Sequence, residues 1–362
     1  MTWNWQKKEW PCFCFDRGAL DGLERVFLKA SGVLEGTYRH LDETDKSELT
    51  VELMSEEACQ TSAIEGEMLE RDSVQSSIRN ELGLQVIPGN SSPAESGVAA
   101  MMVDVYRRWH ERLSDHMLFS WHAMLMKGRR DISDVGCYRS HADPMRVVSG
   151  NLADSRIHFE APPSIMISEE MRQFLGWFNQ SDNEQALIRA GLSHLYFVSI
   201  HPFEDGNGRI GRAISEVALA RSLGRPSLIA LSTTIERRRK HYYQALEMSN
   251  KHLEVTPWLE WFGQTVIDAQ ARSISMIEFL VAKARLYDRV DGKLNARQQK
   301  ALTRMFREGV DGFKGGLSAG NYMKITKAPP STATRDLQDL VETGALKKTG
   351  TLRHTRYFLA LD

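Results

Sequence analysis

The sequence predicts a mainly α-helical protein with one short β-hairpin near its middle and a small separate domain at its end. Three observations support this prediction. Apolar residues recur every three or four positions through most of the 362 residues, which is the period of an amphipathic helix. Two short β-like runs at 145–148 and 156–159 flank a loop at 149–151, as in a hairpin. Residues 291–362 have a pattern of their own, with three helices before a basic ribbon.

Residues 1–96 are expected to form an N-terminal helical extension. Aromatic residues stand mostly at odd positions from Trp3 to Phe15, and this alternation predicts a strand or hairpin. Asp16 is well placed to cap the helix that follows. The helices expected in this part cover about 17–40, 47–65 and 72–82, before a loop at 85–97 that is rich in Pro, Gly, Asn and Ser.

Residues 97–290 are expected to form a central domain that is helical apart from the hairpin. The segment 183–200 is strongly apolar, and 208–223 continues as a second helix. The glycine-rich segment between them therefore joins two helices, which excludes a Walker A loop and a Rossmann turn because both follow a strand. Other helices are expected over about 97–127, 168–178, 235–249 and 257–290.

The last part of the chain is basic. Residues 291–362 hold 13 Lys and Arg against 7 Asp and Glu (net +6), whereas the rest holds 33 against 40 (net −7). Three helices followed by a ribbon are typical of a winged helix-turn-helix, whose third helix would present Thr332, Thr334, Arg335 and Gln338 outward. DNA contact is one expectation, and a protein-interaction module is the alternative. The elements expected are helices at 295–306, 318–325 and from 331, then strands within 345–348 and 353–359.

Composition limits the class of protein. Charged residues make up 26% of the chain and hydrophobic residues 42%, which is ordinary for a globular protein. The apolar runs are too short to span a bilayer, and the first residues lack the apolar stretch of a secretory signal. Four cysteines, at positions 12, 14, 59 and 137, lack metal-ligand spacing. We therefore expect a cytoplasmic protein with reduced thiols and no membrane contact.

The segment 201–212 reads His-Pro-Phe-Glu-Asp-Gly-Asn-Gly-Arg-Ile-Gly-Arg and concentrates chemically useful groups. Its glycines let backbone N–H groups approach a ligand, and a helix N-terminus attracts anions. Arg209 and Arg212 are three apart, so they lie on one helix face and can bind phosphate oxygens. His201 is a possible base and Asp205 a possible metal ligand. The segment therefore predicts a phosphate-binding site.

Glu65 ends the helix over 47–65, just before Gly66. A carboxylate is unfavourable at a helix C-terminus unless a cation meets it. Thr61 lies one turn earlier on the same face. From the local sequence a solvated glutamate is the simpler interpretation. In the helix over 235–249, Tyr242 or Tyr243 could flank a nucleotide base, with a place in the core as the alternative.

The segment 201–212 resembles the Fic family signature, His-Pro-Phe-x-Asp/Glu-Gly-Asn-Gly-Arg-x-x-Arg, and matches every fixed position. The similarity extends over about 98–262 and includes the Gly-Cys-Tyr-Arg run at 136–139. It implies an all-α core with a β-hairpin flap, at about 144–160, that holds a target segment by strand addition. It also implies transfer of AMP from ATP to a Ser, Thr or Tyr hydroxyl of a target protein, with release of pyrophosphate.

Residue by residue, the resemblance implies that His201 is the general base and that Asp205 binds Mg²⁺. Arg209 would hold the β-phosphate and Arg212 the γ-phosphate. Gly206, Asn207 and Gly208 would cradle the α-phosphate, and Met145, Arg146, Val147 and Val148 would lie on the flap. Tyr242 or Tyr243, singled out above from the local sequence alone, would lie near the nucleotide.

The segment Thr61-x-x-x-Glu65-Gly66 resembles the Fic inhibitory motif, Ser/Thr-x-x-x-Glu-Gly/Asn. Because it precedes the core, it implies an inhibitory helix of the N-terminal class. A salt bridge from Glu65 to Arg212 would then occupy the γ-phosphate position and leave ATP in an unproductive pose. The first residues resemble the N-terminal extension of some such proteins, and 291–362 resemble the winged-helix domains often joined to them.

Several functions remain open at this point. The leading one is a self-inhibited protein adenylyltransferase, which can include modification of itself. Removal of AMP from a modified protein, with Glu65 positioning water, uses the same residues, and transfer of UMP is a variant. A DNA-binding regulator that only senses nucleotide belongs to a different class, against which an intact His201 argues. The target protein is not encoded in a readable form, and a homodimer is possible.

Overall fold

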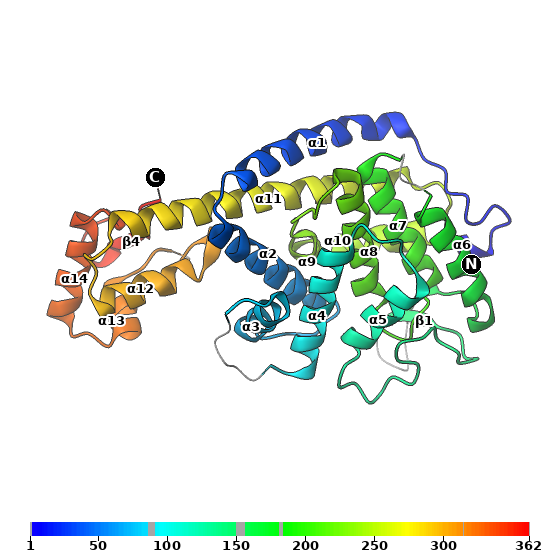
Figure 1. Ribbon diagram of the computed structural model, residues 1–362, viewed down its shortest axis with the longest axis horizontal. Coiled ribbons are helices and arrows are strands. Elements are labelled where there is room, and N and C mark those ends of the chain that lie inside the picture. The colour runs from blue at the N-terminus through cyan, green and yellow to red at the C-terminus, as the bar shows by residue number, and fades with distance from the viewer. Residues whose placement is uncertain (1, 86–90, 150–155, 181–183, 314, 362) are drawn as a thin grey trace. The chain divides into compact units, whose positions relative to one another are not determined.

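A computed structural model shows a mainly helical chain with two antiparallel β-hairpins among its described residues, as predicted (Figure 1). The chain divides into two compact units, Met1–Ser273 and Ile274–Asp362. This division falls inside one long helix, upstream of the boundary expected at 290–291. The structure describes residues 2–85, 91–149, 156–180, 184–313 and 315–361.

The expected N-terminal strand is wrong. Residues Asn4–Gln6 form a single 3₁₀ turn (η1), and the aromatic side chains before α1 reach separate partners. The Trp5 indole N–H donates to the Glu160 carbonyl at 2.7 Å, and the Trp10 indole N–H donates to Glu170 at 2.8 Å. Tertiary hydrogen bonds, not a strand period, therefore set the spacing of these residues.

The first helices begin at side-chain caps. Asp16 caps its helix as predicted, because its carboxylate accepts the Gly18 N–H at 2.9 Å. Asp42 caps the next helix, which therefore starts before residue 47. Ser92 and Glu95 form a capping box, so a helix begins within the loop predicted at 85–97. The helices are α1 (Arg17–Arg39), α2 (Glu43–Ile64), α3 (Arg71–Leu82) and α4 (Pro93–Arg108), and residues 86–90 of the predicted loop lie outside the described residues.

The centre of the first unit is a buried helix, α7 (Ala186–Ile200), all 15 residues of which are buried. It packs along α8 (Asn207–Leu223), so the glycine-rich segment joins two helices as predicted (Figure 1). Glu24 of α1 accepts the N–H groups of Ala186 and Leu187 at 2.9 and 3.1 Å and so caps α7. Residue 183, the expected start of α7, lies outside the described residues.

The predicted hairpin is confirmed. Strands β1 (Arg146–Ser149) and β2 (Arg156–Glu160) pair in antiparallel register, with an irregularity between Val147 and Val148. Most of its predicted loop lies outside the described residues. The helix expected over 235–249 is two helices with a break at Arg238. The remaining helices of this region are α5 (Asp115–Leu125), α6 (Ser164–Phe178), α9 (Leu231–Arg237), α10 (Arg239–Ser249) and α11 (Thr256–Arg289).

The second unit has the predicted order of three helices and a ribbon. Leu302, Leu337 and Leu340 are fully buried in its core. The buried Tyr322 hydroxyl donates to Asp336 at 2.9 Å, which ties two helices together. After the end of α11 its elements are α12 (Ala296–Phe306), η2 (Gly309–Asp311), α13 (Ala319–Thr326), α14 (Pro330–Glu342), β3 (Leu346–Thr349), η3 (Leu352–His354) and β4 (Arg356–Leu359).

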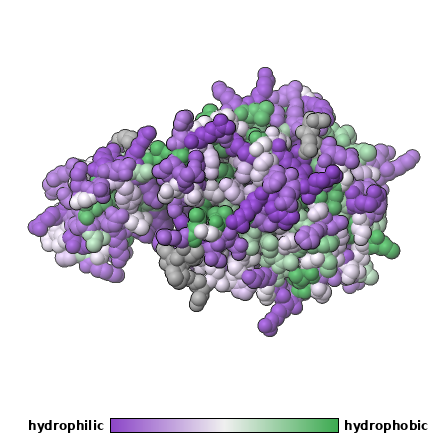
Figure 2. Space-filling view, viewed as in Figure 1, coloured by the Kyte–Doolittle hydropathy of each residue, from purple (hydrophilic) through white to green (hydrophobic). Residues whose placement is uncertain are grey.

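Hydrophilic residues predominate on the face shown in Figure 2, and apolar residues form small separate groups there. None of the described helices combines the length and the apolar character needed to cross a bilayer. The apolar residues of the first unit instead form one large core around α7.

Candidate active site

His201 lies directly after α7 in a left-handed backbone conformation, with φ 52°. Its Nδ1 lies 3.2 Å from the Val198 carbonyl oxygen. A proton on Nδ1 satisfies that contact and leaves Nε2 as a free acceptor. Burial lowers the pKa of His201 to about 4, and the nearby Arg139 charge acts in the same direction. The imidazole is therefore neutral at neutral pH and can take up a proton.

The loop after His201 is held by Asn207. The Asn207 side chain accepts the Phe203 N–H at 3.0 Å and donates to the Phe203 carbonyl at 2.8 Å, and this residue is 2% exposed. The amide therefore shapes the loop, which differs from its implied role as a phosphate donor. Phe203 in turn stacks on His122, with ring centroids 4.3 Å apart. A sequence cannot show whether an amide binds a ligand or its own backbone.

The N-terminus of α8 is an anion-binding position. Gly206 precedes the helix with φ 82°, and no side chain caps it. A Cβ atom at Gly208 would lie 2.1 Å from Oε1 of Glu65, so only glycine lets that carboxylate lie so close. Backbone N–H groups at a helix start favour a negative group. In this structure the negative group is Glu65.

Arg212 is held by the end of α2. Its Nε donates to the Thr61 hydroxyl at 2.7 Å, and its Nη2 donates to the Thr61 carbonyl and to Glu65 Oε1, both at 2.8 Å. The Arg212 side chain is 1% exposed and that of Glu65 26%. The structure thus brings Glu65 and Arg212 together, as the resemblance implies, and the cation is the buried partner.

Arg209 has an acidic partner that the sequence did not indicate. Its Nη1 lies 2.8 Å from Oε2 of Glu67, and its side chain is 4% exposed. Its Nη2 is 3.5 Å from Oδ1 of Asp205. The two arginines implied to bind phosphate are therefore both paired with carboxylates from residues 65–67. The only signal in the sequence is a second glutamate two positions after Glu65.

Asp205 is surrounded by positive groups. Its Oδ2 lies 2.9 Å from Nη1 of Arg129, and its Oδ1 accepts the Gly206 N–H at 2.6 Å. Burial opposes ionisation of Asp205, but Arg209, the Gly206 N–H and Arg129 together hold the pKa of its carboxyl below the usual value. No group of three or more His, Cys, Asp or Glu side chains among the described residues could hold a metal. One carboxylate with substrate phosphates is nevertheless a common Mg²⁺ arrangement, so Asp205 fits this ion.

The two adjacent tyrosines of α10 have different environments. Tyr242 is 1% exposed and its hydroxyl lies 2.8 Å from Nε2 of His194, so most of its side chain belongs to the core, although the residue also lines the cleft described below. Tyr243 is 38% exposed and its hydroxyl donates to the Ile64 carbonyl at 3.1 Å. Its hydroxyl is also 3.3 Å from Oε2 of Glu65. Tyr243 therefore supports the carboxylate that meets Arg212.

A cleft between the hairpin and α10 leads to His201. The residues of the expected flap differ in their positions: Met145, Val147 and Val148 line the cleft, whereas Arg146 pairs with Glu160 across the hairpin at 2.7 Å. The cleft also includes His201, Asp205, Gly206, Asn207 and Gly208. Within the same cleft, His158 and Arg156 of β2 contact Glu247 of α10 at 2.8 and 2.6 Å. The hairpin is thus anchored beside the base.

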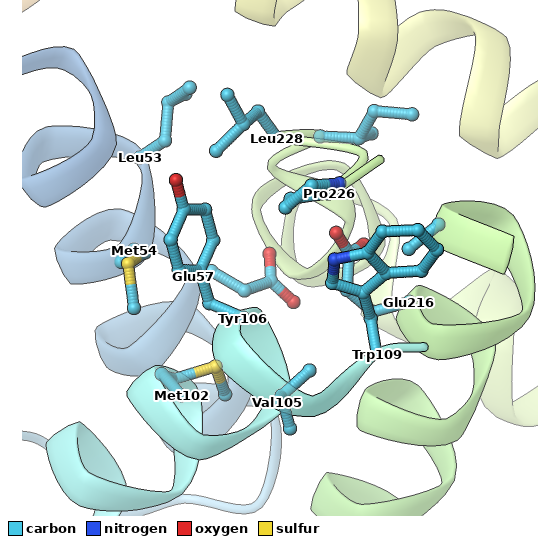
Figure 3. A pocket seen from close by; sticks show the side chains of 12 residues that line it. Leu53, Met54, Glu57, Met102, Val105, Tyr106, Trp109, Glu216, Pro226 and Leu228 are labelled. Carbon is cyan, nitrogen blue, oxygen red and sulfur yellow. The ribbon is translucent and has the colours of Figure 1, made fainter. Parts of the chain in front are cut away.

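A second cavity, shown in Figure 3, is lined by residues of α2, α4 and α8 and by the segment that follows α8. Glu57 of α2 and Glu216 of α8 turn their carboxyl groups towards this mostly apolar cavity. Glu57 accepts the Ser232 N–H at 2.8 Å, and Glu216 accepts the Ser227 hydroxyl. Burial raises the pKa of Glu57 to about 7 and that of Glu216 to about 8. The contact between α2 and α8 therefore contains two carboxyls that resist ionisation.

Two family models match the chain. Residues 112–219 match the model described as Fic/DOC family, and residues 3–84 match a domain of unknown function, DUF4172. The first match contains the segment 201–212. The second covers most of the expected N-terminal extension and includes Thr61 and Glu65.

Two curated relatives are similar to parts of this chain. Protein adenylyltransferase fic-1 of Caenorhabditis elegans is 22% identical over 244 residues, 64% of this chain and 44% of the relative. Uridine 5'-monophosphate transferase of Xanthomonas campestris is 40% identical over 68 residues, 17% of this chain and 12% of the relative. The chain thus spans less than half the length of each.

Among solved structures, a Fic family protein from Desulfovibrio desulfuricans has a TM-score of 0.56 at 21% identity, over 96% of this chain and 98% of its own. A Fic domain containing signaling protein from Bacteroides thetaiotaomicron has a TM-score of 0.53 at 18% identity, over 72% of this chain and 97% of its own. At these identities the likeness shows the fold alone.

Proposed function

This chain is a Fic/DOC family protein related to Fic adenylyltransferases, and from that premise we propose that it transfers AMP from ATP to a hydroxyl group of a target protein. We further propose that Glu65 restrains this activity within the same chain. One observation carries both parts: the Glu65 carboxylate lies on the N-terminal turn of α8 and on Arg212, beside a neutral His201.

The chemistry follows from the groups in the cleft. The target hydroxyl oxygen bonds to the α-phosphorus, the bond from that phosphorus to the β-phosphate bridging oxygen breaks, and pyrophosphate leaves. The hydroxyl proton passes to Nε2 of His201, the ring nitrogen that has no hydrogen-bond partner among the described residues. Nearby phosphate charge raises the pKa of His201 towards the range useful for a base. Asp205 would hold Mg²⁺, which neutralises charge on the phosphates.

Restraint is a competition for the same positive groups. The γ-phosphate and Glu65 both require Arg212, and the phosphates require the α8 N-terminus that Glu65 contacts. Glu67 holds Arg209 in the same way. Nucleotide must therefore displace the segment 65–67 before all its phosphates are bound in the productive pose.

The test is label transfer from α-labelled ATP with Mg²⁺, with label on the chain itself as a first readout. We expect strong transfer by the Glu65→Gly variant, little by wild type, and none by Glu65→Gly combined with His201→Ala. The exposed His116, changed to Ala in the Glu65→Gly background, serves as a control and should leave transfer intact. Absence of transfer by a folded Glu65→Gly variant, with ATP or with UTP, would refute the proposal.

Two related reactions use the same residues. If Glu65 positions water, the wild-type protein removes AMP from a protein that carries it. Loss of label from a pre-modified protein with wild type, and not with Glu65→Gly, would identify this direction. The match to a relative named as a uridine 5'-monophosphate transferase makes α-labelled UTP the matched comparison for ATP.

A second candidate function belongs to the second unit. Thr334, Arg335 and Gln338 are exposed on its third helix, α14, in a segment of net charge +6. We propose that this unit contacts DNA, as a winged helix-turn-helix would. A gel shift of the full chain on duplex DNA at two salt concentrations tests this, with Arg335→Ala as the variant. Binding that is absent, or unaffected by salt, would leave a protein-interaction module.

A further inference from the structure

Arg139 is a buried cation placed beneath the proposed base. Its residue exposure is 2%, and no carboxylate among the described residues pairs with it. Its Nε donates to the His201 carbonyl at 2.8 Å and its Nη2 donates to the Pro162 carbonyl at 2.5 Å. Its Nη1 is buried without a hydrogen-bond partner, and its backbone N–H donates to the Pro202 carbonyl at 2.9 Å.

A buried charge without a counter-ion is costly, so its position needs a reason. Burial lowers the pKa of Arg139 to about 10, which still leaves it protonated at neutral pH. The carbonyl end of α7, which terminates at His201, carries the negative end of a helix dipole. Arg139 meets that end at the His201 carbonyl, so backbone carbonyl groups, of His201 and of Pro162, stand where a carboxylate would otherwise be needed.

These contacts fix the backbone of His201. A left-handed conformation is unfavourable for a residue with a side chain, at about 1–2 kcal/mol. Arg139 binds the two peptide groups that follow this conformation, because its side chain donates to the His201 carbonyl and its backbone N–H donates to the Pro202 carbonyl. The imidazole direction follows from this backbone and from the Nδ1 contact to Val198.

The same guanidinium reaches the hairpin. Pro162 lies two residues after the end of β2. Its carbonyl accepts a hydrogen bond from Nη2 of Arg139, and the His201 carbonyl accepts one from Nε of the same side chain. One planar side chain therefore joins the end of the expected flap to the proposed base. Lysine carries its donors on a single nitrogen, so it lacks the planar fork whose separate nitrogens reach these two carbonyls.

We propose that Arg139 is a positioning residue: it holds His201 in its left-handed conformation and joins it to the flap through Pro162. The inference rests on the proposed transfer reaction for its kinetic consequence, but the effect on the imidazole is independent of any activity. The charged groups that face His201 are Arg139, which lowers its pKa, and Glu65 and Asp205, which raise it.

The first measurement is an NMR titration of His201 in the nucleotide-free chain, with a His201→Ala spectrum to assign the resonance. Removal of a nearby positive charge raises an imidazole pKa, so we expect Arg139→Met to move the midpoint upward by about one pH unit. We expect Arg139→Lys to restore most of this shift, because it restores the charge. Arg221 is the matched control: it also bonds backbone carbonyls, of Trp109 and Glu111, away from His201.

The second measurement uses the Glu65→Gly background. We expect Arg139→Met to lower kcat at least tenfold with KM for ATP changed less than threefold, and to shift the acid limb of the pH profile upward. Arg139→Lys should return the acid limb of the pH profile close to its position with Arg139 but should not restore the full kcat. An unchanged midpoint and an unchanged kcat in Arg139→Met would overturn the inference. If Arg139→Met does not fold, a full wild-type kcat in Arg139→Lys would overturn it. If Glu65→Gly itself transfers nothing, the proposed function fails, and the titration alone decides the inference.

Discussion

Replacement of Glu65 by glutamine tests whether charge, and not shape, restrains the site. The substitution keeps an oxygen that can accept from Arg212 but removes the negative charge. The contact is a single 2.8 Å bond between Oε1 and Nη2, because the other two bonds to this guanidinium come from Thr61. A hydrogen bond to a charged group contributes about 1.5–3 kcal/mol, and a neutral one about half as much.

These magnitudes give the expected order of variants. Complete loss of the contact in Glu65→Gly favours the open site by roughly 10–150-fold, since about 1.4 kcal/mol is a factor of ten. Glu65→Gln should lie between, at roughly 3–10-fold, because the weaker bond persists. The gain comes from relief of competition, so it should be largest at ATP concentrations below saturation.

The assay is the initial rate of label transfer at low ATP, together with the affinity for a non-hydrolysable ATP analogue. Glu260, which is exposed on α11, provides the control variant Glu260→Gln and should behave as wild type. If Glu65→Gln equals wild type while Glu65→Gly is active, shape and not charge blocks the site. If neither variant binds the analogue more tightly, the competition between Glu65 and the γ-phosphate is refuted.

Two further predictions concern nearby carboxylates. Glu67→Gln should release Arg209 and raise the affinity for the ATP analogue by roughly 3–10-fold. Its effect should be less than additive with that of Glu65→Gly, because both residues act through one segment. An unchanged affinity in a titration with the analogue would contradict this prediction. The raised pKa values of Glu57 and Glu216, about 7 and about 8, mean that the folded state retains protons that the unfolded state has released above about pH 4.5. Stability should therefore fall as pH rises to about 8, and Glu216→Gln should flatten this dependence; parallel wild-type and variant unfolding curves from pH 5 to 9 would show that the pair does not resist ionisation.

Local signals explain how much of the fold the sequence predicted. The helix order and the hairpin depend on the spacing of apolar residues, which a linear chain displays directly. Helix starts are harder to predict, because a cap such as Ser92 with Glu95 can lie within a region that otherwise has loop composition. The N-terminal aromatic segment failed for a different reason: its indole groups bond to Glu160 and Glu170, which lie far away in the chain.

The candidate site likewise combines features that local sequence indicates with features that depend on distant partners. The phosphate-binding and proton-accepting side chains of residues 201–212 could be identified from the sequence, because they all lie in one loop and in the first turns of one helix. Tyr242 and Tyr243 could not be separated, since neighbouring residues on a helix face different surroundings, and here one is 1% and the other 38% exposed. The roles of Asn207, Glu67 and Arg129 depended on partners that no spacing rule indicates.

By itself, the sequence determined the helical class, the hairpin and a segment with the chemistry to bind phosphate and accept a proton. Tertiary structure alone decided which charges meet. Glu65 and Arg212 are 147 residues apart, and locally Glu65 is only a carboxylate at an unfavourable helix end. Packing of α2 against α8 brings that carboxylate to a buried guanidinium and a helix N-terminus. Electrostatic attraction acts over a few ångströms of space, so its outcome could not be inferred from local sequence.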